Sequence, residues 1–362
     1  MNTILLIIIY ALFCISMILF NIGLIFYNKI NNSIINKKTD KLKQLIKEQI
    51  DIIDNGLHVE EKHLKYLKKY IKNSNNLIIF DQIIDMFIKK DNPNINMYLS
   101  DLKDIFIDLI YYYDKKNDTE KAYYFSVIKD YDILFKNDQT EIMDILFNSL
   151  HSKNFYCRDN AYLVICKISD TKKIVDALLE ISESNKFFHK NLIKNGLTLY
   201  EEDPNNLLDK LIKKYNKFRN DIKCCIIEYA SYYSSNDNYN AFFLDQLESN
   251  SKDIKISCLY YFECVKYDLA LDSILNNVNS KDFDVSYSAI KSLRNYNKQE
   301  SIEMLKKSAK NNNLKIRDIA CESLAVIRLG FSSKDIIELV PADEADDMYN
   351  YHIRKNMKKM VK

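Results

Sequence analysis

The residues that could carry chemistry are few and scattered in this sequence. Its five histidines are each followed by Val, Leu, Ser, Lys or Ile, and none of its eight cysteines belongs to a C-x-x-C pair. A zinc site needs Cys and His ligands clustered in the chain. The four glycines are too far apart to form a phosphate-binding loop, and no nucleophile motif or carboxylate pair stands out. The sequence therefore predicts no catalytic residue, no cofactor and no metal site.

The cysteines and tyrosines favour a structural interpretation. Most cysteines fall on helical stretches, as small apolar residues do, which predicts buried, reduced thiols in a reducing compartment. The chain has 26 Tyr and no Trp. Aromatic core volume must then come from Tyr and Phe, so we expect core packing rather than a ligand cage. The cysteines are Cys14, Cys157, Cys166, Cys224, Cys225, Cys258, Cys264 and Cys321.

Composition predicts an all-α protein. Four Gly and three Pro in 362 residues are very few, and turns in strand-rich folds depend on those residues. Apolar residues recur at spacings of three and four, the helical period. The elements that could position any site are therefore helices joined by Asn, Asp, Ser and Lys turns.

An apolar run at residues 4–27 predicts a transmembrane helix. Its 24 residues carry no charge and would span about 36 Å as a helix, against a hydrocarbon core of ~30 Å. The short start and the bulky residues at its far end favour an uncleaved anchor over a signal peptide. No Lys or Arg precedes the run, and several Lys follow it. The positive-inside rule places the N-terminus outside and the bulk of the chain in the cytoplasm, at the plasma membrane.

Residues 28–76 form a basic juxtamembrane region. They hold eleven Lys against six Asp and Glu, so the remainder of the chain is slightly acidic. The cluster Lys29–Lys47 could contact anionic lipid, or it could be a solvated helix face. Residues 28–38 look like a linker, and an apolar stripe follows and ends at Asn55-Gly56. A basic segment beside an acidic body is not typical of a nucleic-acid binder, so no nucleic acid is expected as a partner. The stripe is Leu42, Leu45, Ile46, Ile50 and Ile53.

Residues 77–152 read as irregular amphipathic helices or as divergent repeats, and residues 153–340 read as HEAT-like repeats. Six helices begin at intervals of 31, 34, 34, 29 and 31 residues. Apolar or small residues follow each start at offsets 4, 8 and 11, which share one helix face. A second, shorter apolar set separates the helices, so each unit is a helix pair, as in an α-solenoid. The starts are Cys157, Phe188, Ile222, Ile256, Val285 and Ile316.

Two segments resemble the D-x-x-V-R-x-x-A-x-x-x-L core of bacterial HEAT repeats. They are "DFDVSYSAIKSL" from Asp282 and "NLKIRDIACESL" from Asn313. The family's Arg position holds Arg158 and Arg317 but is not Arg elsewhere, so no continuous Asp–Arg ladder is expected. Small residues such as Ala289 would let stacked helices approach closely. The His-Glu pairs on which di-iron hydroxylases of this architecture depend are missing.

The apolar run, the repeat and the lack of catalytic motifs together predict a membrane-tethered scaffold that binds another protein, with an accessory subunit of a membrane enzyme complex as one form of it. The alternative is a HEAT-like modifying or lyase-type enzyme whose active site is not recognised. Residues 341–362 are expected to form a C-terminal capping helix. Residues at offsets 2, 6 and 9 would face outward on the inner row of helices and could bind the partner, or they could merely keep that face soluble. These are Lys190, Lys194, Glu228, Tyr287, Lys291, Arg294, Asp318 and Glu322.

Overall fold

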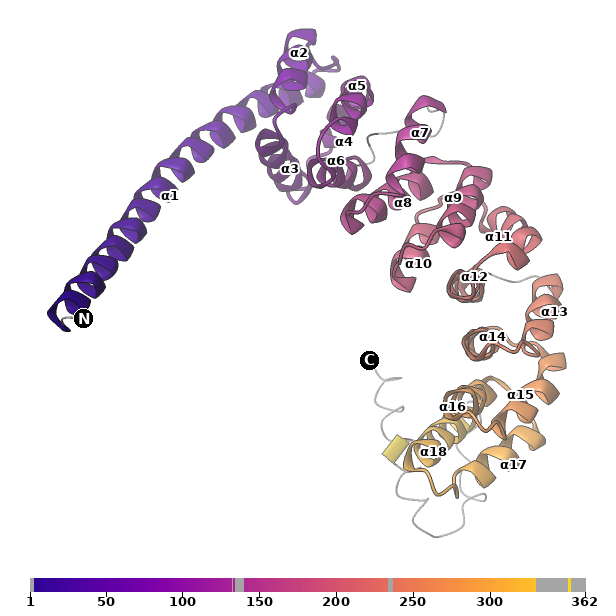
Figure 1. Cartoon of the computed structure of the whole chain (residues 1–362). Coiled ribbons are helices and arrows are strands. Elements are labelled where there is room, and N and C mark those ends of the chain that lie inside the picture. Colours follow the sequence, from indigo (N-terminus) through magenta and orange to yellow (C-terminus); the bar gives the residue numbers. More distant parts are fainter. Residues whose placement is uncertain (1–2, 132, 134–139, 234–236, 330–350, 353–362) are drawn as a thin grey trace. The chain divides into compact units, whose positions relative to one another are not determined.

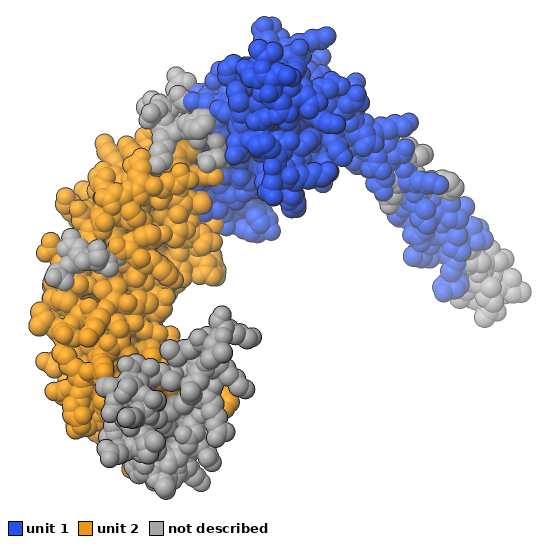
Figure 2. All heavy atoms as spheres, turned by 180° about the vertical axis from the view of Figure 1, so that it is seen from behind, with its two compact units in different colours: residues 1–164 blue, residues 165–362 orange. Residues whose placement is uncertain are grey.

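The predicted all-α class is confirmed by a computed structural model, in which helices make up the regular structure of the described residues (Figure 1). The structure describes residues 3–131, 133, 140–233, 237–329, 351 and 352. The side chains of residues 3–9, 11, 26–28, 30, 31, 140, 141, 237, 328 and 329 lie outside that description. The chain divides into two compact units, Met1–Val164 and Ile165–Lys362, here called unit 1 and unit 2 (Figure 2).

Unit 1 begins with a helix of 52 residues and continues with shorter ones. The long helix α1 contacts α3 and α4, while α5 contacts α2, α4, α6 and α7. Asn73 and Asn117 cap α3 and α6 by accepting hydrogen bonds from the first free backbone N–H groups of each helix. The helices are α1 (Thr3–Asp54), α2 (Glu61–Tyr70), α3 (Ser74–Ile88), α4 (Ile95–Asp101), α5 (Lys103–Asp114), α6 (Asp118–Asp130), α7 (Thr140–Ser149) and α8 (Phe155–Ile168), the last of which crosses the unit boundary.

Helix α1 has two unlike halves. Its second half buries Leu42, Ile46, Ile50 and Ile53, as the apolar stripe predicted. It ends at the predicted stop, where Gly56 takes a φ of 79°. In its first half the described apolar side chains are exposed, and Figure 1 shows this half extending beyond the other helices of unit 1.

The predicted linker at residues 28–38 is wrong, because helix α1 runs through it without a break. The segment contains no Gly or Pro, and an Asn costs a helix only tenths of a kcal/mol, roughly 0.7 at most. Within the part of the chain that the structure describes, no helix combines the length and apolar character that crossing a membrane requires. The anchor at residues 4–27 stays a prediction.

Unit 2 is a stack of helix pairs in two rows. Each helix of the inner row contacts the next one, and outer-row helices pack against them (Figure 1). The inner row is α10 (Lys190–Thr198), α12 (Asn220–Tyr233), α14 (Lys252–Cys264), α16 (Phe283–Ser292) and α18 (Leu314–Leu329). The outer row is α9 (Thr171–Glu183), α11 (Pro204–Lys214), α13 (Asp237–Gln246), α15 (Leu271–Val278) and α17 (Gln299–Ser308). Short 3-10 turns are η1 (Tyr215–Lys217), η2 (Asp268–Ala270) and η3 (Leu293–Asn295).

Burial confirms five of the six predicted repeat starts and corrects one. In α14, Ile256 and Tyr260 are only half-buried and Cys264 is exposed, whereas Ile254 and Cys258 are buried. These residues form two competing apolar stripes on one helix, and the sequence alone favoured the wrong one. In α10 the predicted Phe188 and Gly196 are buried, while Leu192 and Leu199 are half-buried.

The corrected start is Ile254, and it makes the repeat more regular. The intervals become 31, 34, 32, 31 and 31 residues. The small residues expected between stacked helices are confirmed: Ala161, Ala230, Ala289 and Ala320 have no exposed surface. Replacing their methyl groups by larger side chains would push neighbouring helices apart. The predicted capping helix at 341–362 lies outside the described residues except for Tyr351 and His352, which are helical.

Candidate functional site

Most residues of the predicted partner-binding row contact polar side chains on neighbouring inner helices. Lys194 on α10 donates a hydrogen bond of 2.6 Å from Nζ to Oε2 of Glu228 on α12. Both side chains are partly buried. The hydrogen bond to Glu228 raises the pKa of Lys194, so this lysine stays charged and bound to its partner.

The same pattern continues further along the inner row. Glu263 on α14 lies 3.0 Å from Nζ of Lys291 and 3.8 Å from Nη1 of Arg294, both from the α16 repeat. Nη2 of Arg294 lies 3.9 Å from Oε2 of Glu322 on α18. Arg294 thus lies between two carboxylates on neighbouring helices.

A tyrosine pair completes the series. The hydroxyl groups of Tyr232 on α12 and Tyr260 on α14 are 3.3 Å apart, and the hydrogen bond between them raises the pKa of Tyr260. Every neighbouring pair of inner helices is therefore bridged by polar side chains. We call this set the inner ladder: Lys194, Glu228, Tyr232, Tyr260, Glu263, Lys291, Arg294 and Glu322.

Three ladder residues were missed by the sequence analysis. Tyr232 is at offset 10 of its repeat, outside the offsets considered. In the corrected register of α14, Tyr260 and Glu263 occupy offsets 6 and 9, the same positions as Lys291 and Arg294 of α16. The predicted start at Ile256 placed apolar residues at those offsets instead. The signal that could have found Tyr260 and Glu263 is the regularity of the interval, which only the start at Ile254 preserves.

Three predicted residues lie outside the ladder. Lys190 is exposed, and its backbone carbonyl accepts a hydrogen bond from Sγ of Cys225 at 3.6 Å. Tyr287 is half-buried, with its ring 6.0 Å from that of Phe283. Asp318 lies 2.7 Å from Nε2 of His352.

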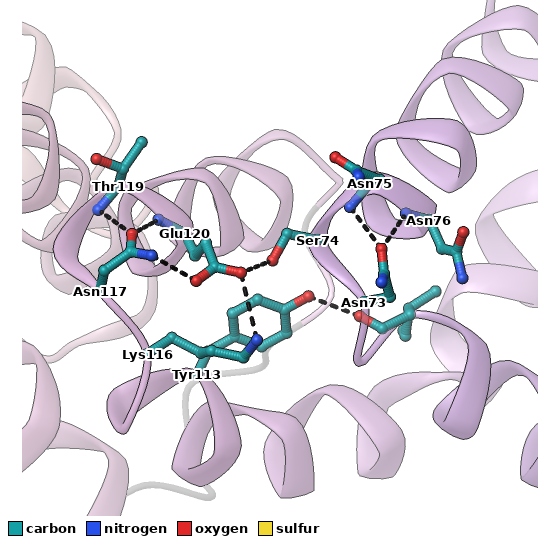
Figure 3. Close-up of polar contacts among 10 residues, drawn as sticks. Asn73, Ser74, Asn75, Asn76, Tyr113, Lys116, Asn117, Thr119 and Glu120 are labelled. Atoms are coloured by element: carbon teal, nitrogen blue, oxygen red, sulfur yellow. Dashed lines mark hydrogen bonds and ion pairs between the residues drawn. The ribbon is translucent and has the colours of Figure 1, made fainter. Parts of the chain in front are cut away.

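A second polar cluster joins three helices of unit 1 (Figure 3). Glu120, in the first turn of α6, accepts hydrogen bonds from Ser74 on α3 and, at 2.6 Å, from Nδ2 of Asn117. Nζ of Lys116 lies 3.3 Å from the same carboxylate. The hydrogen bond from Ser74 holds the pKa of Glu120 below its usual range. This carboxylate therefore stays ionised and engaged, which makes it a poor general acid or base.

Tyr113 on α5 belongs to the same cluster. Its hydroxyl donates a 2.6 Å hydrogen bond to the backbone carbonyl of Ile71, and Figure 3 shows its ring beside Glu120 and Ser74. Oδ1 of Asn73 accepts from the backbone N–H groups of Asn75 and Asn76. The donors at the start of α3 are thus occupied, and the arrangement joins helices rather than presenting a binding site.

Several of the other titratable groups are buried. Six of the eight cysteines are buried, as predicted, while Cys14 is half-buried and Cys264 exposed. Burial raises the pKa of Cys225 to about 12, which leaves it an unreactive thiol. Burial lowers the pKa of His63 to about 4. The tyrosines expected in the core include Tyr98, Tyr113 and Tyr124, all fully buried. Among the described residues, no group of three or more His, Cys, Asp or Glu is placed to hold a metal ion.

Comparison with known proteins gives little guidance. No family model matches the chain, and no curated protein matches it significantly. A structure of human deoxyhypusine hydroxylase in complex with glycerol is 10% identical over 74% of this chain and 97% of that one, with a TM-score of 0.30. The crystal structure of an engineered protein is 15% identical over 64% of this chain and 92% of that one, with a TM-score of 0.24. Scores this low do not establish a shared fold, so the class of the protein, a helical-repeat protein, rests on the packing of unit 2.

Proposed function

We propose that this protein is a membrane-tethered scaffold of the HEAT-repeat type, which binds another protein on the cytoplasmic side of the plasma membrane. Helix α1 would serve as the tether and the helix stack of unit 2 as the display surface. This proposal combines the apolar run at residues 4–27, the lysines after it and the regular helix pairs of unit 2.

The observation that carries the tether is the exposure of the first half of α1. Eleven large apolar side chains between Tyr10 and Ile25 are 41–71% exposed. Consecutive residues such as Ile18, Leu19 and Phe20 point to different sides of the helix, so the apolar surface surrounds it. A helix apolar on all sides is stable only inside a larger core or in lipid. The described residues of unit 1 provide no such core for it, which favours lipid.

The surface lysines support the proposed orientation. Lys29, Lys37, Lys38 and Lys41 follow the apolar half of α1 and are exposed. They precede the part of α1 that packs into unit 1. Such a cluster suits the cytoplasmic headgroup layer, where each Lys near an anionic surface contributes roughly 1 kcal/mol.

Alkaline extraction of membranes from cells that express the full chain tests the tether. We expect the wild-type chain to stay in the membrane pellet and a Leu19→Arg/Phe20→Arg double variant to be released, because each Arg near the middle of a spanning helix costs about 3 kcal/mol. Ile34→Arg/Ile35→Arg is the matched control, since these exposed residues lie on the same helix beyond the apolar run. Release of the wild-type chain, or full retention of the Leu19/Phe20 variant, would overturn the tether.

A further inference from the structure

A row of exposed apolar side chains lies at the start of the inner helices of unit 2. An exposed residue lies just before the repeat start of each inner helix, one position before Phe188 in the first repeat and two positions before the start in the other four. Three of the five are large and apolar: Phe187 is 73%, Phe283 38% and Leu314 58% exposed. Phe283 and Leu314 hold the same position in adjacent repeats, and Phe187 lies one position later in its repeat. We call the residues around them, 184–190, 217–223, 249–255, 280–286 and 311–317, the N-terminal edge.

Contacts between repeats show that neighbouring segments of this edge lie side by side. Nη1 of Arg219, just before α12, donates a 2.9 Å hydrogen bond to the backbone carbonyl of Ser184, which precedes α10. Nζ of Lys252, at the start of α14, lies 3.1 Å from Asp282 before α16. These contacts join two pairs of neighbouring segments, and the packing of α12 on α14 and of α16 on α18 brings the other segments into the same stack.

The N-terminal edge is strongly basic. Its five segments contain ten Lys and Arg against four Asp, a net charge of +6, although the whole chain carries only +2. Three of the four Asp are already bound within the edge: Asp221 to Arg219, and Asp282 and Asp284 to Lys252. The exposed lysines include Lys190, Lys217, Lys281 and Lys315.

The N-terminal edge differs from the inner ladder in what it offers a partner. The ladder's charges contact one another across helix interfaces, so a ligand would have to displace them. The edge combines exposed aromatic and aliphatic side chains with an excess of positive charge. Hot spots of protein interfaces are enriched in such apolar anchors, and complementary charge steers the partner and fixes its register.

We infer that the N-terminal edge of unit 2 binds an extended, acidic segment of the partner protein that carries apolar side chains. This inference rests on the proposed scaffold function and names its surface and the chemistry of its partner. Packed helices lie about 8–10 Å apart, close to the length of three residues of extended chain at ~3.3 Å each. Phe283 and Leu314, from adjacent repeats, would therefore bind apolar residues three positions apart, with Asp or Glu facing the lysines.

A displayed library of random 16-residue peptides, selected on the full chain in nanodiscs of zwitterionic lipid, tests the inference. We expect the enriched peptides to be acidic and to carry two or more large apolar residues. Their affinity should fall at least tenfold in a Phe187→Ser/Leu314→Ser variant and should also fall as salt is added. Tyr232→Ser/Leu269→Ser is the matched control, because these side chains of unit 2 are 64% and 71% exposed but lie outside the edge. The affinity of this control variant for the enriched peptides should be unchanged.

The possible failures are distinguishable. If enriched peptides bind but depend on Tyr232 and Leu269, or are neutral or basic, the edge is not the site, while the scaffold function stands. If no peptide is enriched, both the inference and the protein-binding function are wrong. If hydrogen exchange at Phe187 and Leu314 slows on nanodiscs of anionic lipid but not with any peptide, the edge contacts membrane, and the inference is wrong.

Discussion

Units 1 and 2 join their helices in different ways. In unit 2, the ladder contacts Tyr232–Tyr260, Glu263–Lys291 and Arg294–Glu322 each link residues 28 positions apart. In unit 1, buried tyrosine hydroxyls bind backbone carbonyls of other helices at irregular separations. Tyr113 reaches back 42 residues to Ile71, and Tyr124 only 18 to Phe106. Three of the ladder contacts thus share one separation, whereas Lys194–Glu228 spans 34 residues and the two tyrosine contacts of unit 1 differ more widely.

This difference implies that the two units should respond to different perturbations. Unit 1 depends on a few large aromatic side chains whose hydroxyls are satisfied inside the core, so single losses there should be costly. Unit 2 distributes its stability over similar interfaces, and each contact of its inner ladder is partly exposed to solvent. Truncating a core side chain should therefore lower the free energy of unfolding strongly in unit 1. Overpacking or charge changes in unit 2 should lower it less.

Truncating Tyr124 should give the largest effect. Tyr124 is fully buried, its ring stacks at 4.3 Å on that of Tyr113, and its hydroxyl donates to the carbonyl of Phe106. We expect Tyr124→Ala to lower the free energy of unfolding by about 3–5 kcal/mol, measured by urea denaturation of the full chain. Tyr156→Ala, at a residue of the same unit that is 60% exposed, should cost less than about 0.5 kcal/mol. Equal costs for the two variants would contradict the aromatic core.

Acid should destabilise unit 1 through His63. The pKa of His63 is lowered to about 4 by burial, against ~6.5 when unfolded, so the unfolded chain binds the proton first as the pH falls. Stability should be full above pH ~6.5 and decline toward pH 4, by about 3 kcal/mol from this group. His63→Leu should remove that part of the slope, although it leaves the hydroxyl of Tyr98 without its 2.9 Å contact. His151→Leu, at an exposed position, should keep the slope. An unchanged slope in His63→Leu would contradict this assignment.

Overpacking a small buried residue should destabilise unit 2. Ala289 has no exposed surface and lies on α16, which contacts both α14 and α18. Ala289→Phe should cost about 1–3 kcal/mol, because the neighbouring inner helices must move apart. Asn297→Phe, at an exposed position of the same repeat, serves as the control and should be nearly neutral. If Ala289→Phe is neutral too, the helices are not closely stacked there.

Breaking the inner ladder should have the smallest effect. Glu263 is 15% exposed and lies near both Lys291 and Arg294. We expect Glu263→Gln to cost about 1 kcal/mol, since partly exposed ion pairs contribute little. Glu248→Gln, on an exposed turn, is the control. The charge exchange Glu263→Lys with Lys291→Glu should recover part of the unfolding free energy that each single variant loses. If the losses of the two single variants simply add up in the double variant, the ladder contact does not contribute to stability.

The sequence predicted the regular parts of the molecule because their signals are local. The stripe of α1 and the small residues Ala289 and Ala320 follow from helical periodicity alone. Helix α14 was misread because its two apolar stripes are equally good locally, and only burial by neighbouring helices selects Ile254. The contact of Glu263 with the next repeat depended on that choice, so it could not be predicted. The cluster around Glu120 joins residues 46 positions apart, which no local pattern reveals.

The topology of the tethered chain can be measured with its own cysteines. Cys264 is the one cysteine among the described residues that is classed as exposed, and it lies in unit 2, whereas Cys14 lies in the apolar half of α1. A membrane-impermeant maleimide added to intact cells should leave Cys264 unlabelled, and permeabilising the membrane should expose it. Cys264→Ser should remove that signal. Labelling of Cys264 on intact cells would contradict a tether that places unit 2 in the cytoplasm.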